Sequence, residues 1–179
     1  MSILKVAHMG HPVLRAKAGP VPAAEIRSPA IQQLIDDMFE TMHEYAGIGL
    51  AAPQVHVGLR LFVAGVRQAP DGELNDDAEM PYLTVINPEI TVVGPDVEDG
   101  WEGCLSIPDV RGLVPRAKEI SVRALDRHGK RMTLAARGLP ARVIQHETDH
   151  LDGVLFFDRM PSLVSLTFMD EYQRYWAKE

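Results

Sequence analysis

The segment HETDH, residues 146–150, constrains this 179-residue chain more than any other feature of its sequence. Two histidines four residues apart lie on one face of an α-helix, so both imidazole rings can reach a single ion. Glu147 follows the first histidine, where its carboxylate can move protons to and from a water on that ion. HExxH on a helix is a signature of metal hydrolases. The sequence therefore predicts a helix that carries two metal ligands and an acid/base.

A third protein ligand is needed, because catalytic sites of this type usually have three and leave one position open. Many HExxH proteases take it from a downstream His or Glu, but no histidine follows His150, and Glu171 has no supporting motif. Cys104 is the better candidate, since a thiolate is a strong ligand and glycines mark its segment. Taken alone, a single cysteine is more often a small buried hydrophobe, and a lone HExxH is about as often an exposed helical face.

Composition narrows the class of protein. Hydrophobic residues make up 46% and charged residues 24%, which is typical of a globular domain with a real core, so we expect one domain over residues 1–179. The net charge of −7 argues against a specific nucleic-acid partner. One cysteine excludes an internal disulfide, and neither a signal peptide nor a membrane-spanning run is evident. These features predict a cytoplasmic protein without a membrane partner.

The first long element is predicted to be a helix over residues 29–45, with Ser28 as its cap and Pro29 in the first helical position. Apolar residues recur through it at helical spacing. Gly47 is a natural stop. Residues 47–54 contain two glycines and a proline, which favour a tight irregular loop rather than a strand or a helix.

The middle of the chain is rich in β-branched residues. We expect strands at residues 59–66, 82–93, 113–126 and 130–136. Pro88 interrupts the second, so it is one strand or two short ones. The last two form a hairpin around an Arg-His-Gly turn. The polar residues 67–81 are expected to be an exposed excursion.

Two helices complete the prediction. The first spans residues 139–153 and carries HETDH, and the last spans residues 163–177 with Ser162 as its cap. The apolar stripe of the last helix comprises Val164, Phe168, Tyr172 and Tyr175. We expect that stripe to pack against the core. The order of elements favours an α+β fold with a mainly antiparallel sheet.

Three segments taken together resemble the peptide deformylase family: GIGLAAPQ at residues 47–54, EGCLS at 102–106 and QHETDHLDG at 145–153. The family signatures are GxGxAAxQ, EGCxS and QHExDHLxG, and they occur here in the same order. The resemblance implies a compact α+β fold, with mainly antiparallel sheets around the HExxH helix and a C-terminal helix. It also implies a metal-dependent hydrolase that removes the N-formyl group from the formylmethionine of newly synthesised polypeptides and releases formate.

The resemblance also implies roles for individual residues. The metal ligands are Cys104, His146 and His150, and Glu147 is the catalytic acid/base. Gln54 and the backbone N–H of Leu105 bind the developing oxyanion. The resemblance suggests Fe²⁺ in the cell, although Zn²⁺ binds such sites more tightly, and Zn²⁺, Ni²⁺ or Co²⁺ in purified protein.

By analogy with the family, the residues expected to contact the substrate are Ile48, Gly49, Gly103, Arg111, Leu139, Arg142 and Val143. Ile48, Leu139, Val143 and the stem of Arg142 are expected to line a methionine pocket. Gly49 would let the backbone pass close to the substrate, the Ile48 and Gly103 segments would pair with the peptide backbone, and Arg111 would steady a peptide carbonyl. Ordinary core packing or solvent exposure is the alternative for each residue taken alone.

Glu102 and Arg116 flank the Cys104 segment with opposite charges, and we hypothesise that they pair and hold it in place. A surface ion pair is the alternative. The partners predicted for the protein are N-formylmethionyl nascent peptides, acted on by a monomer. Ribosome docking by the C-terminal helix rests on only Arg174 and Lys178.

Two other functions remain open from the sequence. A zinc endopeptidase would need a third ligand downstream of His150, which the sequence does not offer as a histidine. A non-enzymatic binding module with a structural ion would need a fourth protein ligand. Intact Glu147 and Gln54 disfavour the second alternative, since a structural ion needs neither.

Overall fold

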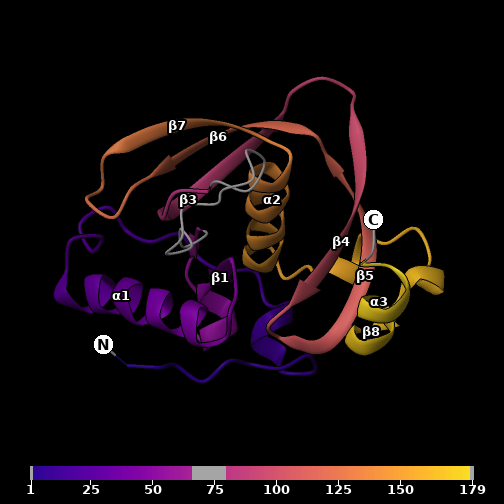
Figure 1. The fold of residues 1–179 in the computed structure, drawn as a ribbon. Coiled ribbons are helices and arrows are strands. Elements are labelled where there is room, and N and C mark those ends of the chain that lie inside the picture. Colours follow the sequence, from indigo (N-terminus) through magenta and orange to yellow (C-terminus); the bar gives the residue numbers. More distant parts are fainter. Residues whose placement is uncertain (1, 66–79, 178–179) are drawn as a thin grey trace, which may run out of the picture.

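The computed structural model describes residues 2–65 and 80–177, and Figure 1 shows the arrangement of their elements. The excursion predicted at residues 67–81 lies outside the described residues except for its last two. Among the helices of the described residues, none has both the length and the apolar character needed to cross a bilayer.

Helix α1, Pro29–Glu44, confirms the first predicted helix and ends one residue earlier. The Ser28 hydroxyl caps it by accepting a hydrogen bond from the Ile31 N–H at 3.3 Å. Its buried face, which includes Ile35, Met38 and Met42, packs in a cluster with apolar residues of the first two strands. α1 therefore covers one end of the sheet described next.

A five-stranded antiparallel sheet has the order β1-β2-β3-β6-β7. Its strands are β1 Gly49–Ala51, β2 Leu61–Ala64, β3 Leu83–Val92, β6 Glu119–Leu125 and β7 Arg131–Arg137. β3 is one strand with a register shift between Ile86 and Glu89, where Asn87 has φ 52° and Pro88 lacks an N–H. The predicted β6–β7 hairpin is confirmed, and Asp126 Oδ1 accepts from the N–H groups of His128 and Lys130 in its turn.

The prediction of an irregular loop at residues 47–54 is wrong. Gly49–Ala51 forms β1 at the edge of the sheet, and Ala52–Val55 forms the 3₁₀ turn η2. Three residues are too few to show the alternation of apolar and polar residues that marks a strand in a sequence. β1 forms because its backbone pairs with β2, from Gly49 opposite Ala64 to Ala51 opposite Phe62. The strand fixes the path of the chain into η2.

A second sheet contains β4 Val97–Cys104, β5 Ile107–Ala117 and the short β8 Thr167–Phe168, in the order β4-β5-β8. The single strand predicted at residues 113–126 is therefore wrong. The chain changes sheets at Lys118, whose N–H donates to the Asp96 carbonyl at 2.9 Å. β5 and β6 thus belong to different sheets although only one residue separates them.

Helix α2, Leu139–Leu151, carries HETDH and lies between the two sheets (Figure 1). It contacts β1, β2 and β7 of the first sheet and β5 of the second. Most of its residues from Val143 to Leu151 are buried. This confirms the α+β fold with antiparallel sheets packed around the HExxH helix.

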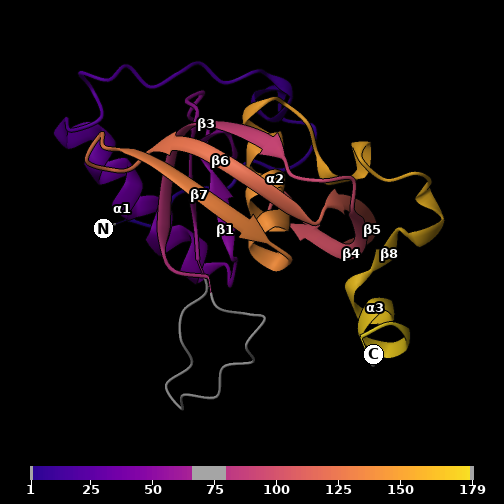
Figure 2. The same cartoon turned by 90° about the horizontal axis from the view of Figure 1, so that it is seen from above.

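The prediction of one helix over residues 163–177 is wrong. The segment forms a 3₁₀ turn η4 Leu163–Ser165, then β8, then a short helix α3 Met169–Tyr175. Ser162 caps η4 rather than a long helix. Val164 is 94% exposed and Phe168 67%, so the predicted stripe does not pack against the core. Figure 2 shows α3 and α1 at opposite ends of the molecule.

Candidate metal centre and active site

The predicted metal ligands meet at one point although Cys104 and His146 lie 42 residues apart in the sequence. The Cys104 thiol at the end of β4 lies 3.2 Å from His150 Nε2, and the rings of His146 and His150 are 5.0 Å apart between centroids. The ligand atoms of all three lie within 4.8 Å of one another. One thiolate and two imidazoles are a donor set suited to Zn²⁺, Fe²⁺ and similar divalent ions, so these residues fit a catalytic metal.

The protonation state of the Cys104 thiol suits metal binding. Burial alone would raise its pKa, but the imidazoles of His150 and His146 outweigh burial and hold the pKa well below its usual range. The thiolate is the form that binds metals.

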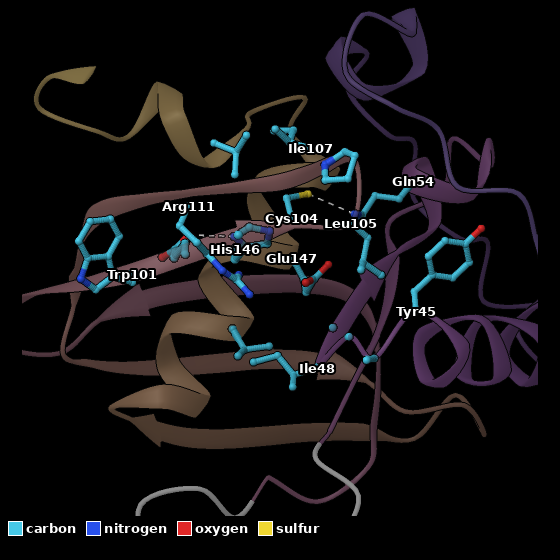
Figure 3. A pocket seen from close by; sticks show the side chains of 18 of the residues that line it. Tyr45, Ile48, Gln54, Trp101, Cys104, Leu105, Ile107, Arg111, His146 and Glu147 are labelled. Atoms are coloured by element: carbon cyan, nitrogen blue, oxygen red, sulfur yellow. Dashed lines mark hydrogen bonds and ion pairs between the residues drawn. The ribbon is translucent and has the colours of Figure 1, made fainter. Parts of the chain in front are cut away.

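Glu147 lies beside this cluster and points into the same cavity (Figure 3). It is buried, its Oε2 has no hydrogen-bond partner among the described residues, and burial raises its pKa to about 7. A carboxyl group that titrates near neutrality can both accept and deliver a proton. Gly49 lies directly against it, since a Cβ on Gly49 would come within 2.7 Å of the Glu147 carboxyl carbon.

Gln54 is buried in η2, and its amide orientation is fixed on both sides. Its Oε1 accepts from the Ala51 N–H at 2.8 Å, while its Nε2 donates to Ser106 Oγ at 3.2 Å and contacts Cys104 Sγ at 3.4 Å. The Nε2–H group is therefore aimed at the metal cluster (Figure 3). Leu105 follows Cys104 in the tight turn between β4 and β5 and lines the same cavity.

The hypothesised Glu102–Arg116 pair is present, and it is buried rather than on the surface. Arg116 Nε and Nη2 donate to the two Glu102 oxygens at 2.9 and 3.0 Å, and both side chains are about 5% exposed or less. Glu102 Oε2 lies 2.8 Å from His146 Nδ1, which fixes the orientation of that ring. Burial would raise the Glu102 pKa, but His146 and Arg116 together lower it to about 2.

The network of ion pairs around Glu102 and Arg116 continues to residues that the sequence did not predict for the site. Arg116 also donates to Asp149, which accepts from Arg159 Nη2 at 2.7 Å, and the Arg159 side chain is half exposed. Charges of alternating sign thus run from the surface to His146, a predicted metal ligand. The sequence signals for Asp149 were its fixed position in the QHExDHLxG signature and its place three residues after His146, about one helical turn along α2.

A cleft of about 590 Å³ opens over the metal cluster. Every residue predicted to contact substrate lines it: Ile48, Gly49, Gly103, Arg111, Leu139, Arg142 and Val143. The Arg142 guanidinium is held at one wall, where it donates to Glu102 at 2.9 Å and to the carbonyls of Glu98 and Val114 at 2.6 and 2.7 Å. Trp101 and Met169 also line the cleft, although no sequence motif pointed to either of them.

Comparison with known proteins agrees with this geometry. The family model for polypeptide deformylase matches residues 3–165. Peptide deformylase 2 of Pseudomonas putida is 44% identical over 169 residues, which are 94% of this chain and 93% of the relative. Peptide deformylase 2 of Xanthomonas campestris pv. campestris is 48% identical over 164 residues, 91% of this chain and 90% of the relative.

Solved structures give the same result. The Met-Ala-Ser-bound class I type b peptide deformylase from Acinetobacter baumannii superposes with a TM-score of 0.82 at 42% identity, over 89% of this chain and 100% of that chain. Peptide deformylase from Thermotoga maritima gives 0.79 at 37% identity, over 90% of this chain and 100% of that chain. By sequence along nearly its whole length and by fold, this chain belongs to the polypeptide deformylase family.

Proposed function

We propose that the cleft over Cys104, His146 and His150 performs the reaction of this family: hydrolysis of the N-formyl group from the N-terminal formylmethionine of newly synthesised polypeptides, with release of formate. The observation that carries the proposal is the convergence of one thiol and two imidazoles beside a buried carboxyl group, Glu147, in one cleft. The proposed catalytic domain comprises residues 1–179.

Cys104, His146 and His150 would hold one divalent ion. Such an ion lowers the pKa of a bound water and polarises a carbonyl oxygen. We propose Fe²⁺ as the ion in the cell, with Zn²⁺, Ni²⁺ or Co²⁺ as substitutes in purified protein. Iron-loaded enzyme should lose activity rapidly in air while nickel-loaded enzyme keeps it, and equal air stability of all forms would count against iron.

Glu147 acts as acid and base in this proposal. Its carboxylate takes a proton from the attacking water, and the carboxylic acid so formed gives it to the departing amine nitrogen of methionine. An amine leaves poorly until it is protonated, so one group must perform both transfers. A pKa near 7 in the protein without its ion suits that double role.

Two donors stabilise the negative charge that develops on the formyl oxygen. These are Gln54 Nε2, aimed at the cluster by its bond from Ala51, and the backbone N–H of Leu105. Loss of one such donor costs on the order of 3–4 kcal/mol of transition-state stabilisation. Replacing Gln54 with Leu should therefore lower kcat far more than it raises KM.

The methionine side chain would occupy the apolar wall of the cleft. Ile48, Leu139 and Val143 supply that wall, and a flexible thioether fits such a slot well. The stem of Arg142 closes it, because the guanidinium is fixed by four carbonyl or carboxylate acceptors. The substrate backbone would pair with the Ile48 and Gly103 segments while Arg111 steadies a carbonyl.

In the cell, we propose a cytoplasmic monomer that acts on nascent chains near the ribosome exit. The C-terminal segment carries exposed apolar residues on α3 and η4, among them Tyr175 and Leu163, which are 65% exposed. Co-sedimentation with ribosomes tests docking, and gel filtration with light scattering tests the monomer.

The decisive experiment compares formyl-Met-Ala-Ser with an unformylated internal peptide and measures formate beside metal content. Formate release from the first peptide alone is expected. Replacing Glu147 with Ala should keep the ion and lower turnover by several orders of magnitude. Cleavage of only the internal peptide would instead establish an endopeptidase.

A further inference from the structure

The segment after α2 approaches the predicted metal ligand His146 in two ways. Phe156 is buried in the 3₁₀ turn Phe156–Asp158, and its ring stacks on the His146 imidazole with 6.4 Å between centroids and 18° between planes. Arg159 follows this turn and forms the outer end of the network of ion pairs that leads to His146 Nδ1. One short segment is therefore connected both to the face of the ring and to one of its nitrogens.

The two imidazoles of the metal cluster differ in what orients them. His146 Nδ1 lies 2.8 Å from Glu102 Oε2, whereas His150 Nδ1 is buried and has no hydrogen-bond partner among the described residues. A hydrogen bond between a carboxylate and one ring nitrogen orients a metal-binding histidine. Only the His146 ring has such a bond, so the position of the Glu102 carboxylate matters for the geometry of the cluster.

Arg116 holds that carboxylate but is shared between two acidic side chains. Its Nε and Nη2 donate to Glu102, and its Nη1 donates to Asp149. Asp149 has a second partner, since Arg159 donates to it from Nε at 3.1 Å and from Nη2 at 2.7 Å. The Asp149 side chain is only about 10% exposed, so its charge needs partners. Without Arg159, its one remaining ion-pair partner among the described residues would be Arg116, which would be drawn away from Glu102.

The outer part of the network lies outside the catalytic cleft. Arg116, Asp149 and Arg159 line a second cavity of about 430 Å³, and none of the three lines the cleft over the metal cluster. The two cavities adjoin different faces of α2, because His146 and Glu147 line the cleft whereas Asp149 lines the second cavity. A substitution at Arg159 therefore removes no side chain from the cleft.

We propose that Arg159 is a positioning residue for His146. By pairing with Asp149, it leaves Arg116 to hold Glu102 against the imidazole. The Arg159 side chain is 51% exposed, so the orientation of a buried metal ligand depends on a residue at the surface. This inference rests on the proposed metal site and therefore on the proposed function.

The affinity for Zn²⁺ tests the proposal. Competition with a chelator gives the Kd of wild-type protein and of Arg159→Met at a temperature where both are folded. The variant should bind Zn²⁺ about tenfold more weakly, which is the lower end of the loss expected for partners outside the ligand shell. Arg127→Met is the matched control, since Arg127 also donates from Nε and Nη2, at 3.1 Å to Gln32 and 2.8 Å to Asp36, and neither acceptor lines the cleft. Its Kd should equal that of wild type.

The absorption spectrum of bound Co²⁺ gives a second readout that needs no turnover. The visible bands of Co²⁺ depend on the arrangement of its ligands. At saturating Co²⁺, the spectrum of Arg159→Met should therefore differ from that of wild type, while the spectrum of Arg127→Met should superpose on it. A loss of stability alone would leave the saturated spectrum unchanged.

A double-mutant cycle tests the route through Arg116. In an Arg116→Met background, Arg159→Met should weaken Zn²⁺ binding much less than it does in wild type, because the intermediate side chain is already lost. An equal loss in both backgrounds would contradict the proposal.

Unchanged Zn²⁺ affinity with an unchanged Co²⁺ spectrum in Arg159→Met would overturn the proposal. So would tighter binding, which would mean that the arginine acts only through repulsion between its charge and the ion. Failure of the proposed function has a different signature, since wild-type protein would then bind no Zn²⁺ at Cys104, His146 and His150 or would release no formate from formyl-Met-Ala-Ser.

Discussion

At the scale of single residues, the site depends on small side chains that leave room for large ones. Gly49 was expected to bring backbone close to the substrate, and its closest neighbour in the structure is Glu147. Gly100 has the same relation to Arg142, since a Cβ there would come within 2.6 Å of the guanidinium carbon. These glycines allow the charged groups to reach their positions.

Replacing Gly49 with Ala should therefore displace the Glu147 carboxyl group while the three metal ligands stay in place. We expect kcat to fall by at least about tenfold, because a small displacement of an acid/base costs that much or more, with metal content unchanged. Formate release and metal analysis of the same preparation check this. Wild-type kcat in the variant would show that Glu147 has room to adapt.

The buried charge network permits a stability test. Replacing Arg116 with Met would leave Glu102 and Asp149 buried with fewer partners, which should lower the free energy of unfolding by about 3–5 kcal/mol. Arg123→Met is the control, because Arg123 and Glu89 form an ion pair whose side chains are about 70% exposed. Losing that pair should lower the free energy of unfolding by less than about 1 kcal/mol. Urea unfolding of the metal-free proteins measures both, and equal losses would contradict the assignment.

The sequence motifs identified the residues that cluster at the candidate metal site, but not the partners that hold those residues. Cys104, His146, His150, Glu147 and Gln54 come together as expected. Arg142 donates to backbone carbonyls 28 to 44 residues away as well as to the Glu102 carboxylate, and no local pattern can reveal such contacts. The Glu102–Arg116 pair was found only because both residues flank a motif.

At the scale of elements, local patterns predicted the long helices and the hairpin. They failed where pairing with the edge of a sheet determines the conformation of a segment. Residues 163–177 have helical spacing of apolar residues, yet Thr167–Phe168 pairs with the free edge of β5. Gly49–Ala51 likewise becomes a strand through pairing with β2. Backbone pairing with a distant strand outweighs weak local preference in segments this short.

The turn after α2 offers a prediction at this scale. Asp158 in η3, Phe156–Asp158, accepts from Arg15 in the N-terminal turn η1, Pro12–Arg15, and from the Leu155 N–H at 2.7 Å. Partial burial would raise the Asp158 pKa, but these two donors outweigh it and lower the pKa. A lowered pKa means that the carboxylate stabilises the fold above its ordinary pKa and that this contribution is lost as the pH falls further.

Wild-type protein should therefore lose stability between about pH 5 and pH 2 more steeply than Asp158→Asn, which has no carboxylate to protonate. The midpoint of thermal unfolding across this range measures the difference. Asp170→Asn, on the C-terminal helix, is the control and should follow the wild-type curve. Parallel curves of the unfolding midpoint against pH for wild type and Asp158→Asn would contradict the proposed stabilising role of the Asp158 carboxylate.

At the scale of the whole molecule, the metal site joins two parts of the fold. Cys104 belongs to the β4–β5 sheet, whereas His146 and His150 belong to α2, which is packed mainly on the other sheet. A bound ion thus links the second sheet to the central helix. The same geometry bears on the competing functions. An endopeptidase would take its third ligand from downstream of His150, and a closed structural site would need a fourth protein ligand, whereas the cluster found among the described residues has three.

An ion that binds only the folded state must stabilise it, by about 4 kcal/mol when its free concentration is a thousand times Kd. Addition of Zn²⁺ to metal-free protein should therefore raise Tm by several degrees in wild type and in His128→Ala, whose histidine is exposed. Cys104→Ser should lose most of this shift, since a hydroxyl is a far weaker ligand than a thiolate.

Because Cys104 is the only cysteine, a thiol reagent offers an independent check on the same sample. Labelling should be rapid without the ion, as the lowered thiol pKa predicts, and blocked with it. A Tm shift in Cys104→Ser equal to that of wild type, or a labelling rate that is the same with and without the ion, would place the metal elsewhere.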